Sequence, residues 1–393
     1  MIYNFDEIID RRGSDCLKYD FAKERGKSDD LLPMWIADMD FKAAPEISKA
    51  LQKLIDHGVY GYTDTKSDYF EAVYNWFHSR HQYELCEEAL IKAPSIVYAI
   101  AAAVQSFTSK GDAIIIQTPV YYPFYDAILR NDRKLVENTL YIENGKYRID
   151  FDDFEKKIVS ENVKMFILCS PHNPVSRVWT REELLKLGNI CLKHKVLVFS
   201  DEIHCDFVYG DNKHFVFPSL SKEFEDNTIL ATSASKSFSL AGLHNCNIFI
   251  KNKELKRLYQ STIEKAGYSQ PNMMGIAATK AAYKSGGAWF DDLLVYLNEN
   301  ITFMREFIQK NMPKIHMIEP EGTYLIWVDM RELGLDDAKR DEFIEKKAKL
   351  WLNKGSIFGK ASKGFERFNI ACPKATLKEA MERLKKAYDE LES

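Results

Sequence analysis

A lysine set among small hydroxyl side chains has the clearest chemical potential in the chain. Residues 233–242 read Ser-Ala-Ser-Lys-Ser-Phe-Ser-Leu-Ala-Gly, which places Lys236 between a predicted strand and a turn that contains glycine. A lysine amine can form an imine with a carbonyl cofactor when desolvation or neighbouring cations lower its pKa. The hydroxyls of Ser233 and Ser235 can hydrogen-bond a phosphate. The alternative interpretation is a solvated surface lysine in a serine-rich loop.

An acidic residue follows the apolar run at residues 196–199. Asp201 comes directly after this predicted strand, and the carboxyl ends of parallel strands are where ligands bind. Its carboxylate can pair with a protonated ring nitrogen, which is the electronic requirement of pyridoxal phosphate (PLP). The alternative is that Asp201 caps a helix. Glu202 alternates away from Asp201 and is predicted to be structural.

Two further strand ends carry side chains that suit a planar, phenolic cofactor. Asn173 lies in the rigid Pro-His-Asn-Pro turn and can hydrogen-bond a phenolic oxygen, although Asn-Pro is also a common Asx turn. Tyr121 leaves the strand at 113–117 and can lay its ring over such a cofactor, whereas Tyr122 is expected to point elsewhere. The alternative for this aromatic pair is core packing.

Anion-binding groups are also present. Residues 93–97 open a predicted helix, whose first amides are free donors and suit a phosphate, although every helix has such an end. Arg367 lies in a predicted strand near the carboxyl end of the chain. Its guanidinium fork matches an amino-acid carboxylate through two parallel hydrogen bonds, and the alternative is a surface ion pair.

The combination is more specific than any one motif. Four successive strand ends offer a ring stacker, an oxygen ligand, a ring-nitrogen partner and an imine-forming lysine, with a phosphate cradle upstream. No purely structural role explains why all of them occur in one chain. The sequence therefore predicts a PLP enzyme whose cofactor is held on Lys236.

The candidate site residues lie between predicted strands and helices, because short apolar runs alternate along the chain with segments of helical periodicity. Such alternation predicts an α/β fold with a mixed, mostly parallel sheet between helices. The expected strands are 113–117, 164–169, 196–199, 228–231 and 247–250, and the expected helices include 94–107, 180–193 and 254–265. The tail predicts helix 289–311, strand 323–329, helix 341–353, strand 365–370 and a helix from 376. We expect a large PLP-binding domain (45–286), a smaller α+β domain (287–393) and an opening segment (1–44) that packs with it.

Composition excludes several classes of protein. The 393 residues carry a formal net charge of −4, which argues against a nucleic-acid partner or a polybasic membrane contact. No run approaches the roughly 18 apolar residues of a spanning helix. Seven scattered cysteines fit free thiols and a cytoplasmic location. The nine histidines form no zinc-type motif, so no metal is expected, and no Gly-x-Gly-x-x-Gly or Walker-type loop is present.

Five segments together resemble a known family. Residues 32–41, 58–63, 170–174, 200–206 and 233–242 are similar to those of fold-type-I PLP enzymes in the class I/II aminotransferase superfamily. More narrowly, the whole chain resembles the cystathionine β-lyase-like C–S lyases of the MalY/PatB group. Two positions depart from many aminotransferases: His204 stands where a tyrosine is common, and His244 where a phosphate-binding arginine is common. Both changes occur in the lyase-like group, and they weaken a plain transaminase assignment.

The resemblance implies a role for each site residue. It makes Lys236 the Schiff-base lysine, Asp201 the pyridinium partner and Asn173 the ligand of the phenolic oxygen. The remaining implied roles are the ring stacker (Tyr121), a further cofactor neighbour (His204), the phosphate ligands (Ser233, Ser235 and the amides of Ile96 and Val97), the substrate-carboxylate ligand (Arg367), the substrate entrance within residues 35–38 (Trp35 and Ala37), and a contact to the neighbouring subunit's cofactor (Tyr62). Asn173 and Tyr121 would border the substrate as well.

The function that the resemblance implies is β-elimination from a sulfur-bearing amino acid such as cystathionine or cysteine. Lys236 would act as the general base, and the products would be a thiol, pyruvate and ammonia. The expected partners are the amino-acid substrate and a second copy of the chain, in a homodimer with shared sites. An aminotransferase that uses the same residues is the alternative. A secondary regulatory role through protein contacts is a further one.

Overall fold

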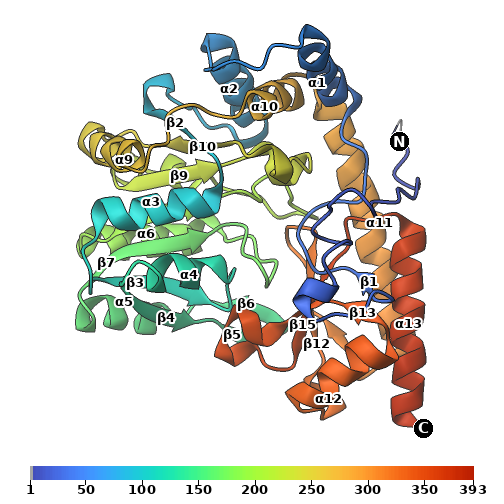
Figure 1. The fold of residues 1–393 in the computed structure, drawn as a ribbon. Coiled ribbons are helices and arrows are strands. Elements are labelled where there is room, and N and C mark those ends of the chain that lie inside the picture. The colour runs from blue at the N-terminus through green and yellow to red at the C-terminus, as the bar shows by residue number, and fades with distance from the viewer. Residues whose placement is uncertain (1–2) are drawn as a thin grey trace.

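The computed structural model describes residues 3–393, and its central element is a seven-stranded sheet (Figure 1). Strands β4, β3, β7, β8 and β9 run parallel, whereas β10 is antiparallel to both of its neighbours. The predicted α/β fold with a mixed, mostly parallel sheet is confirmed. The strand order is β2 (Leu90–Ala93), β10 (Cys246–Phe249), β9 (Thr228–Thr232), β8 (Leu197–Asp201), β7 (Val163–Cys169), β3 (Ala113–Thr118) and β4 (Lys134–Thr139).

Helices cover both faces of this sheet, which explains why its inner strands β3, β7 and β9 are almost continuously buried. Side chains alternate between the faces: Ile114 and Ile116 of β3 join one buried cluster, and Ile115 joins another. The first cluster includes α3 (Ile96–Phe107), α4 (Pro123–Leu129) and α9 (Lys253–Lys265). The second includes α5 (Phe151–Ser160), α6 (Arg181–Lys193) and α7 (Lys222–Asp226).

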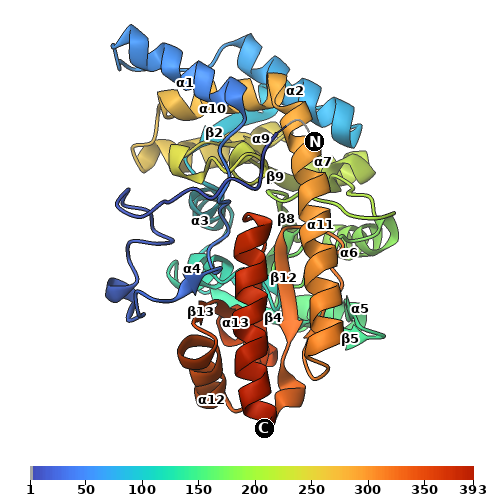
Figure 2. The same ribbon diagram turned by 90° about the vertical axis from the view of Figure 1, so that its right-hand side faces the viewer.

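A smaller sheet lies beside the long helices of the tail, and both ends of the chain contribute to this part of the molecule (Figures 1 and 2). Its order is β11 (His316–Met317), β12 (Leu325–Asp329), β15 (Phe365–Asn369) and β14 (Asn353–Lys354). Helices α11 (Gly287–Asn311) and α13 (Lys374–Glu392) pack against each other. In the opening segment, β1 (Leu32–Pro33) pairs in parallel with β13 (Leu350–Trp351). The division of the chain at residues 44 and 286 remains a prediction.

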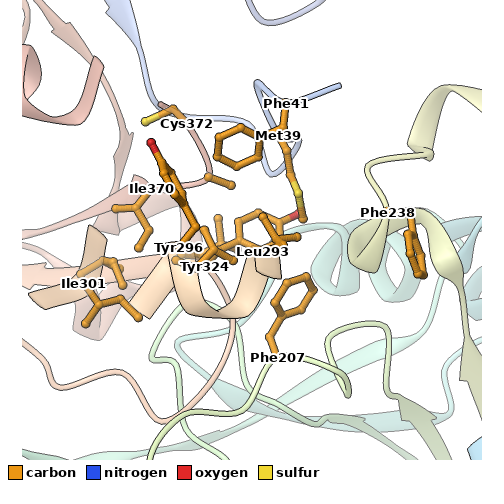
Figure 3. Close-up of a cluster of buried hydrophobic side chains, with 14 of the residues drawn as sticks. Met39, Phe41, Phe207, Phe238, Leu293, Tyr296, Ile301, Tyr324, Ile370 and Cys372 are labelled. Carbon is orange, nitrogen blue, oxygen red and sulfur yellow. The ribbon is translucent and has the colours of Figure 1, made fainter. Parts of the chain in front are cut away.

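A large apolar core joins these parts. It contains side chains of α1 (Pro45–His57), α2 (Ser67–His81), α10 (Met273–Ser285) and α11. Figure 3 shows Met39 and Phe41 of the opening segment near Phe207, Leu293 and Tyr324 in this core. Besides several 3-10 turns, the short elements include the hairpin of β5 (Tyr141–Glu143) and β6 (Lys146–Arg148), helix α8 (Ala234–Ser237) and helix α12 (Asp337–Asp341).

The predicted helix at 341–353 is wrong in its second half. Helix α12 continues into a π-helical turn, Glu342–Lys347, and the chain then forms the two short strands β13 and β14. Lys349 has a φ of 52°, which ends the helical path. Beyond it, Trp351 stacks on Trp35 with ring centroids 4.6 Å apart, so packing against the opening segment overrides the local helical pattern. Strand β12 also begins at Leu325 rather than at 323, because Thr323 has a φ of 62°.

Among residues 3–393, no helix combines the length and the apolarity required to cross a bilayer. The longest helix of this range, α11, has 25 residues, and its charged side chains include Asp291 and Arg305.

Candidate active site

The predicted strand ends meet at one cavity. It has about 770 Å³ of space outside protein atoms, part of it open to solvent, and lies where β3, β7, β8 and β9 end. Parallel strands bring their carboxyl ends to the same edge of the sheet, which explains why distant motifs converge. The predicted site residues that line it are Lys236, Asp201, Asn173, Tyr121, His204, Ser233, Ser235, Ile96, Val97 and Ala37.

Lys236 lies on the short helix α8, which follows β9 and is capped by Ser233. Its Nζ donates a hydrogen bond of 2.6 Å to the carbonyl oxygen of Ala37. Burial lowers the pKa of Lys236 to about 8, and the positive charge of Arg367 acts in the same direction, while Asp38 and Asp201 oppose it. The interpretation as a solvated surface lysine is therefore wrong, and a large fraction of this amine is neutral near pH 8.

The turn that carries Lys236 is anchored from behind. Ser237 Oγ donates to the buried carboxylate of Asp206, which also accepts from Trp76 Nε1 at 3.0 Å and lies 2.9 Å from His81 Nε2. Cys205 brings a third possible metal ligand to His81 and Asp206. Because the carboxylate oxygens already have these partners, we interpret the cluster as a support for α8.

Asp201 ends β8 with a side chain that is 4% exposed. Its Oδ1 accepts a hydrogen bond from the amide of Ile203 at 3.2 Å, and burial raises its pKa to about 7. The helix-cap alternative is wrong, because the next helical turn of the described chain starts at Phe217. Glu202 points away from the cavity, where it pairs with His214 and accepts from the amide of Phe217, as expected for a structural residue.

Arg367 and Asn173 contact each other at the boundary of the two sheets. Arg367 lies on β15, is 3% exposed, and donates through Nη1 to Asn173 Oδ1 at 2.9 Å. Its Nη2 donates to the carbonyl of Trp35 at 2.8 Å and to Asn353 Oδ1. Its Nε has no partner among residues 3–393, and burial lowers its pKa to about 10. The surface ion-pair interpretation of Arg367 is therefore wrong.

Tyr121 and His204 border the cavity from two different strand ends. The amide of Tyr121 donates to the carbonyl of Asn173 at 3.1 Å, and burial raises the pKa of its hydroxyl. Tyr122 lines a separate cavity with Trp35 and so points elsewhere, as expected. His204 is 3% exposed, and its Nδ1 has no partner within the described chain. Burial, with the charges of Lys236 and Arg367, lowers the pKa of His204, so its imidazole is neutral.

The amino-terminal end of α3 faces the same cavity. Ser95 caps this helix by accepting from the amide of Tyr98 at 3.2 Å. The amides of Ile96 and Val97 open the helix and have no carbonyl one turn earlier to bind. Across the cavity, Ser233 Oγ already donates to the carbonyl of Asn245 at 2.8 Å and accepts from the amide of Ser235, so Ser233 holds the turn together.

Three predicted residues lie outside the cavity lining: Arg367, which contacts the lining residue Asn173, and also Trp35 and Tyr62. The ring of Trp35 stacks on Trp351, and the residue contributes only its carbonyl oxygen, to Arg367. Tyr62 is 97% exposed on the connection between α1 and α2.

Sequence reasoning missed several residues that line the cavity. These are Ile203, Asn245, Cys169 and Cys246. Alternation beyond Asp201 signals Ile203, because residues two apart in an extended chain face the same side. Cys169 ends the expected strand 164–169, so the position of strand ends signals it too, whereas no local pattern signals Asn245 or Cys246.

The fold and the site define a class of protein: the chain belongs to the family described as aminotransferase class I and II, whose profile matches residues 30–384. Cystathionine beta-lyase PatB of Bacillus subtilis (strain 168) is 40% identical over 98% of this chain and 99% of its own. The structure of cystalysin from Treponema denticola, which contains a pyridoxal 5′-phosphate cofactor, superposes with a TM-score of 0.96 at 37% identity and full coverage of both chains. The PLP-bound C–S lyase from Staphylococcus hominis superposes with a TM-score of 0.92 at 34% identity, covering 98% of each chain. The predicted resemblance to cystathionine β-lyase-like enzymes is confirmed.

Proposed function

We propose that this protein is a PLP-dependent C–S β-lyase, which converts a sulfur amino acid such as cystathionine or cysteine to a thiol, pyruvate and ammonia. The observation that carries the proposal is the convergence of Lys236, Asp201 and Asn173 on one cavity, where Asn173 also accepts a hydrogen bond from Arg367. The names of the relatives at 34–40% identity over nearly the whole chain support the same chemistry.

The cavity fits the cofactor group by group. Lys236 offers a desolvated amine for the aldehyde, and Asp201 offers a buried carboxyl group for the ring nitrogen. The free amides at the start of α3 suit the phosphate. The unpartnered Nδ1 of His204 and the side-chain amide nitrogen of Asn173 offer polar contacts, and Tyr121 supplies an aromatic face.

The residues of the chain then divide the work on the substrate. Arg367 binds the α-carboxylate, because its buried guanidinium has neutral partners and an unpaired Nε. The amine of Lys236 would take the proton from Cα as a general base. When bound, PLP would supply an electron-poor ring that stabilises negative charge at Cα, and Asp201 would hold the ring nitrogen in its protonated form. The thiolate leaves from Cβ, and water then releases ammonia and pyruvate.

We also propose that the active enzyme is a homodimer. Tyr62 is 97% exposed, and three other apolar side chains within seven residues of it in the sequence, Ile55, Val59 and Tyr60, are exposed as well. Exposed aromatic and aliphatic side chains concentrated in one segment suit a partner surface. In the dimer, Tyr62 would approach the cofactor phosphate bound by the other subunit. Loss of activity in Tyr62→Ala, with recovery when it is mixed with Lys236→Ala, would support shared sites.

The direct test uses purified protein loaded with PLP. With cystathionine or cysteine we expect equal amounts of thiol and pyruvate, and neither product with Lys236→Ala. Absence of both products from a well-folded, PLP-loaded wild type would refute the proposal.

The aminotransferase alternative rests on the family itself, because the same lysine can return the proton to the cofactor instead of assisting elimination. Addition of a 2-oxo acid separates the two reactions. An aminotransferase would convert it to the corresponding amino acid, whereas a lyase would leave it unchanged and release thiol.

A further inference from the structure

The carbonyl oxygen of Ala37 accepts two hydrogen bonds. One comes from Lys236 Nζ at 2.6 Å and the other from the hydroxyl of Tyr324 at 3.1 Å. A carbonyl oxygen has two lone pairs, so these donors fill its capacity. The two donor atoms therefore lie within about 6 Å of each other.

The loop around Ala37 is held firmly from the small sheet. Asn369 Nδ2 donates to the carbonyls of Ile36 and Asp38, each at 2.6 Å. The amide of Asp38 also donates to the carbonyl of Ile36 at 2.9 Å, which closes a three-residue turn. With both neighbouring carbonyls bound to Asn369, the carbonyl of Ala37 is left to face Lys236 and Tyr324.

Charged groups of the opening segment fix the far end of this loop. Arg11 forms ion pairs of 2.7 Å with both Asp38 and Asp40, and Lys18 forms one of 2.7 Å with Asp40. Lys18 is 1% exposed. The loop therefore cannot shift without breaking buried or half-buried ion pairs, so the acceptor offered to Lys236 is rigid.

Tyr324 reaches Ala37 from the apolar core. Its side chain is fully buried, with its ring edge-on to Phe207 at 5.0 Å and to His204 at 5.9 Å, and Figure 3 shows it among apolar side chains. Burial raises the pKa of Tyr324 well above its usual value, so the hydroxyl stays protonated. At the Ala37 oxygen it can act only as a donor.

We propose that Tyr324 is a positioning residue for Lys236. Its hydroxyl holds the Ala37 carbonyl against the core. As a second donor to the same oxygen, it also weakens the hydrogen bond by which that oxygen stabilises the ammonium form of Lys236. This inference rests on the proposed role of Lys236 as the base. Two donors on one acceptor weaken each other, because the first withdraws electron density from the oxygen. Tyr324 thereby favours the neutral amine that removes the Cα proton.

Several charged or titratable groups face Lys236 and set the background for this effect. Asp38 and Asp201 favour the ammonium form, whereas Arg367 and burial favour the neutral amine. His204 is neutral and Tyr324 is protonated, so neither adds a charge. Against this background, removal of the Tyr324 hydroxyl leaves Ala37 as a stronger acceptor and raises the pKa of Lys236.

The experiment compares Tyr324→Phe with Tyr209→Phe. Tyr209 is a matched control, because its hydroxyl is buried and has no hydrogen-bond partner in the described chain. The first measurement is the pH dependence of Lys236 acetylation in the full-length, cofactor-free protein, read by peptide mass spectrometry. The second is kcat and KM of the PLP-loaded enzyme with ordinary and Cα-deuterated cystathionine.

For Tyr324→Phe we expect the acetylation midpoint to rise by roughly 0.5 to 1 pH unit, the scale of one neutral hydrogen bond. We expect kcat to fall roughly 2- to 10-fold with a larger deuterium isotope effect, and KM to stay unchanged. Tyr209→Phe should match the wild type. An unchanged midpoint and isotope effect in folded Tyr324→Phe would overturn the inference, as would equal shifts in both variants. A wild type without lyase activity would refute the proposed function instead, because the acetylation midpoint is measured without substrate.

Discussion

Arg367 offers a quantitative test of substrate binding, because it is a buried cation whose hydrogen-bond partners are all neutral. The substitution Arg367→Lys keeps the positive charge but removes the planar fork that can hold a carboxylate through two parallel bonds. We expect the variant to fold and to bind PLP, since the cofactor-facing residues Lys236 and Asp201 are untouched. We expect it to bind the substrate's α-carboxylate poorly.

The structure sets the scale of this effect. Burial lowers the pKa of Arg367 to about 10, which corresponds to about 3 kcal/mol against the charged form, as an order of magnitude. Hydrogen bonds to Asn173, Asn353 and Trp35 offset part of this cost, and a substrate carboxylate can offset the rest. A charge-assisted hydrogen bond contributes about 1.5–3 kcal/mol. Loss of one of the two bonds therefore lowers kcat/KM roughly 10- to 150-fold.

The assay compares cystathionine with an analogue that lacks the α-carboxylate. In the wild type, the analogue should react far more slowly, and Arg367→Lys should slow cystathionine but not slow the analogue further. Arg340→Lys is the matched control. Arg340 is equally buried, but it already forms ion pairs with Glu366 and Asp337 and so is not available to a substrate. The kcat/KM of this variant should therefore stay near the wild-type value. Equal losses for cystathionine and the analogue in Arg367→Lys would refute the role of the guanidinium.

Three further predictions follow from the same structure. In the cofactor-free protein, acetylation of Lys236 should have a midpoint near pH 8, because burial lowers its pKa. Peptide mass spectrometry measures this midpoint, and a value near 10.5, as for exposed lysines, would contradict the prediction. Asp201→Asn should lower kcat by roughly 100-fold or more while the visible absorption of bound PLP persists, since the ring nitrogen loses its anionic partner. Gly188→Ala should lower the thermal unfolding midpoint and leave kcat unchanged, because the added Cβ would lie 2.2 Å from the Phe224 ring. The expected loss in the free energy of unfolding is roughly 1–3 kcal/mol. An unchanged midpoint would contradict the close packing of α6 against Phe224.

The site was predictable to the extent that it depends on strand ends. Tyr121, Asn173, Asp201 and Lys236 each follow an apolar run, and a parallel sheet must bring such ends together. The same pattern could not locate Asn245 or Cys246. Strand β10 is antiparallel, so its first residue, and not its last, lies at the edge of the sheet that borders the cavity. The composition of a short apolar strand does not indicate its direction.

Contacts made by the main chain were not predictable either. The carbonyl of Ala37 holds Lys236, yet a carbonyl group is common to every residue and leaves no signature in the sequence. Tyr324 was not singled out, because a tyrosine beside an apolar strand is ordinary core composition. The helix expected at 341–353 failed for a similar reason: the stacking of Trp351 on Trp35 depends on a partner more than 300 residues away along the chain.

The most direct test concerns the amine on which the proposed chemistry depends. PLP-loaded protein is reduced with borohydride, digested and examined by mass spectrometry to find the residue that carries the cofactor. We predict that the added mass lies on the peptide containing Lys236, and that Lys236→Ala retains none. Recovery of the cofactor on another lysine, or of an unmodified Lys236 peptide from fully loaded protein, would contradict the assignment of this cavity as a PLP site.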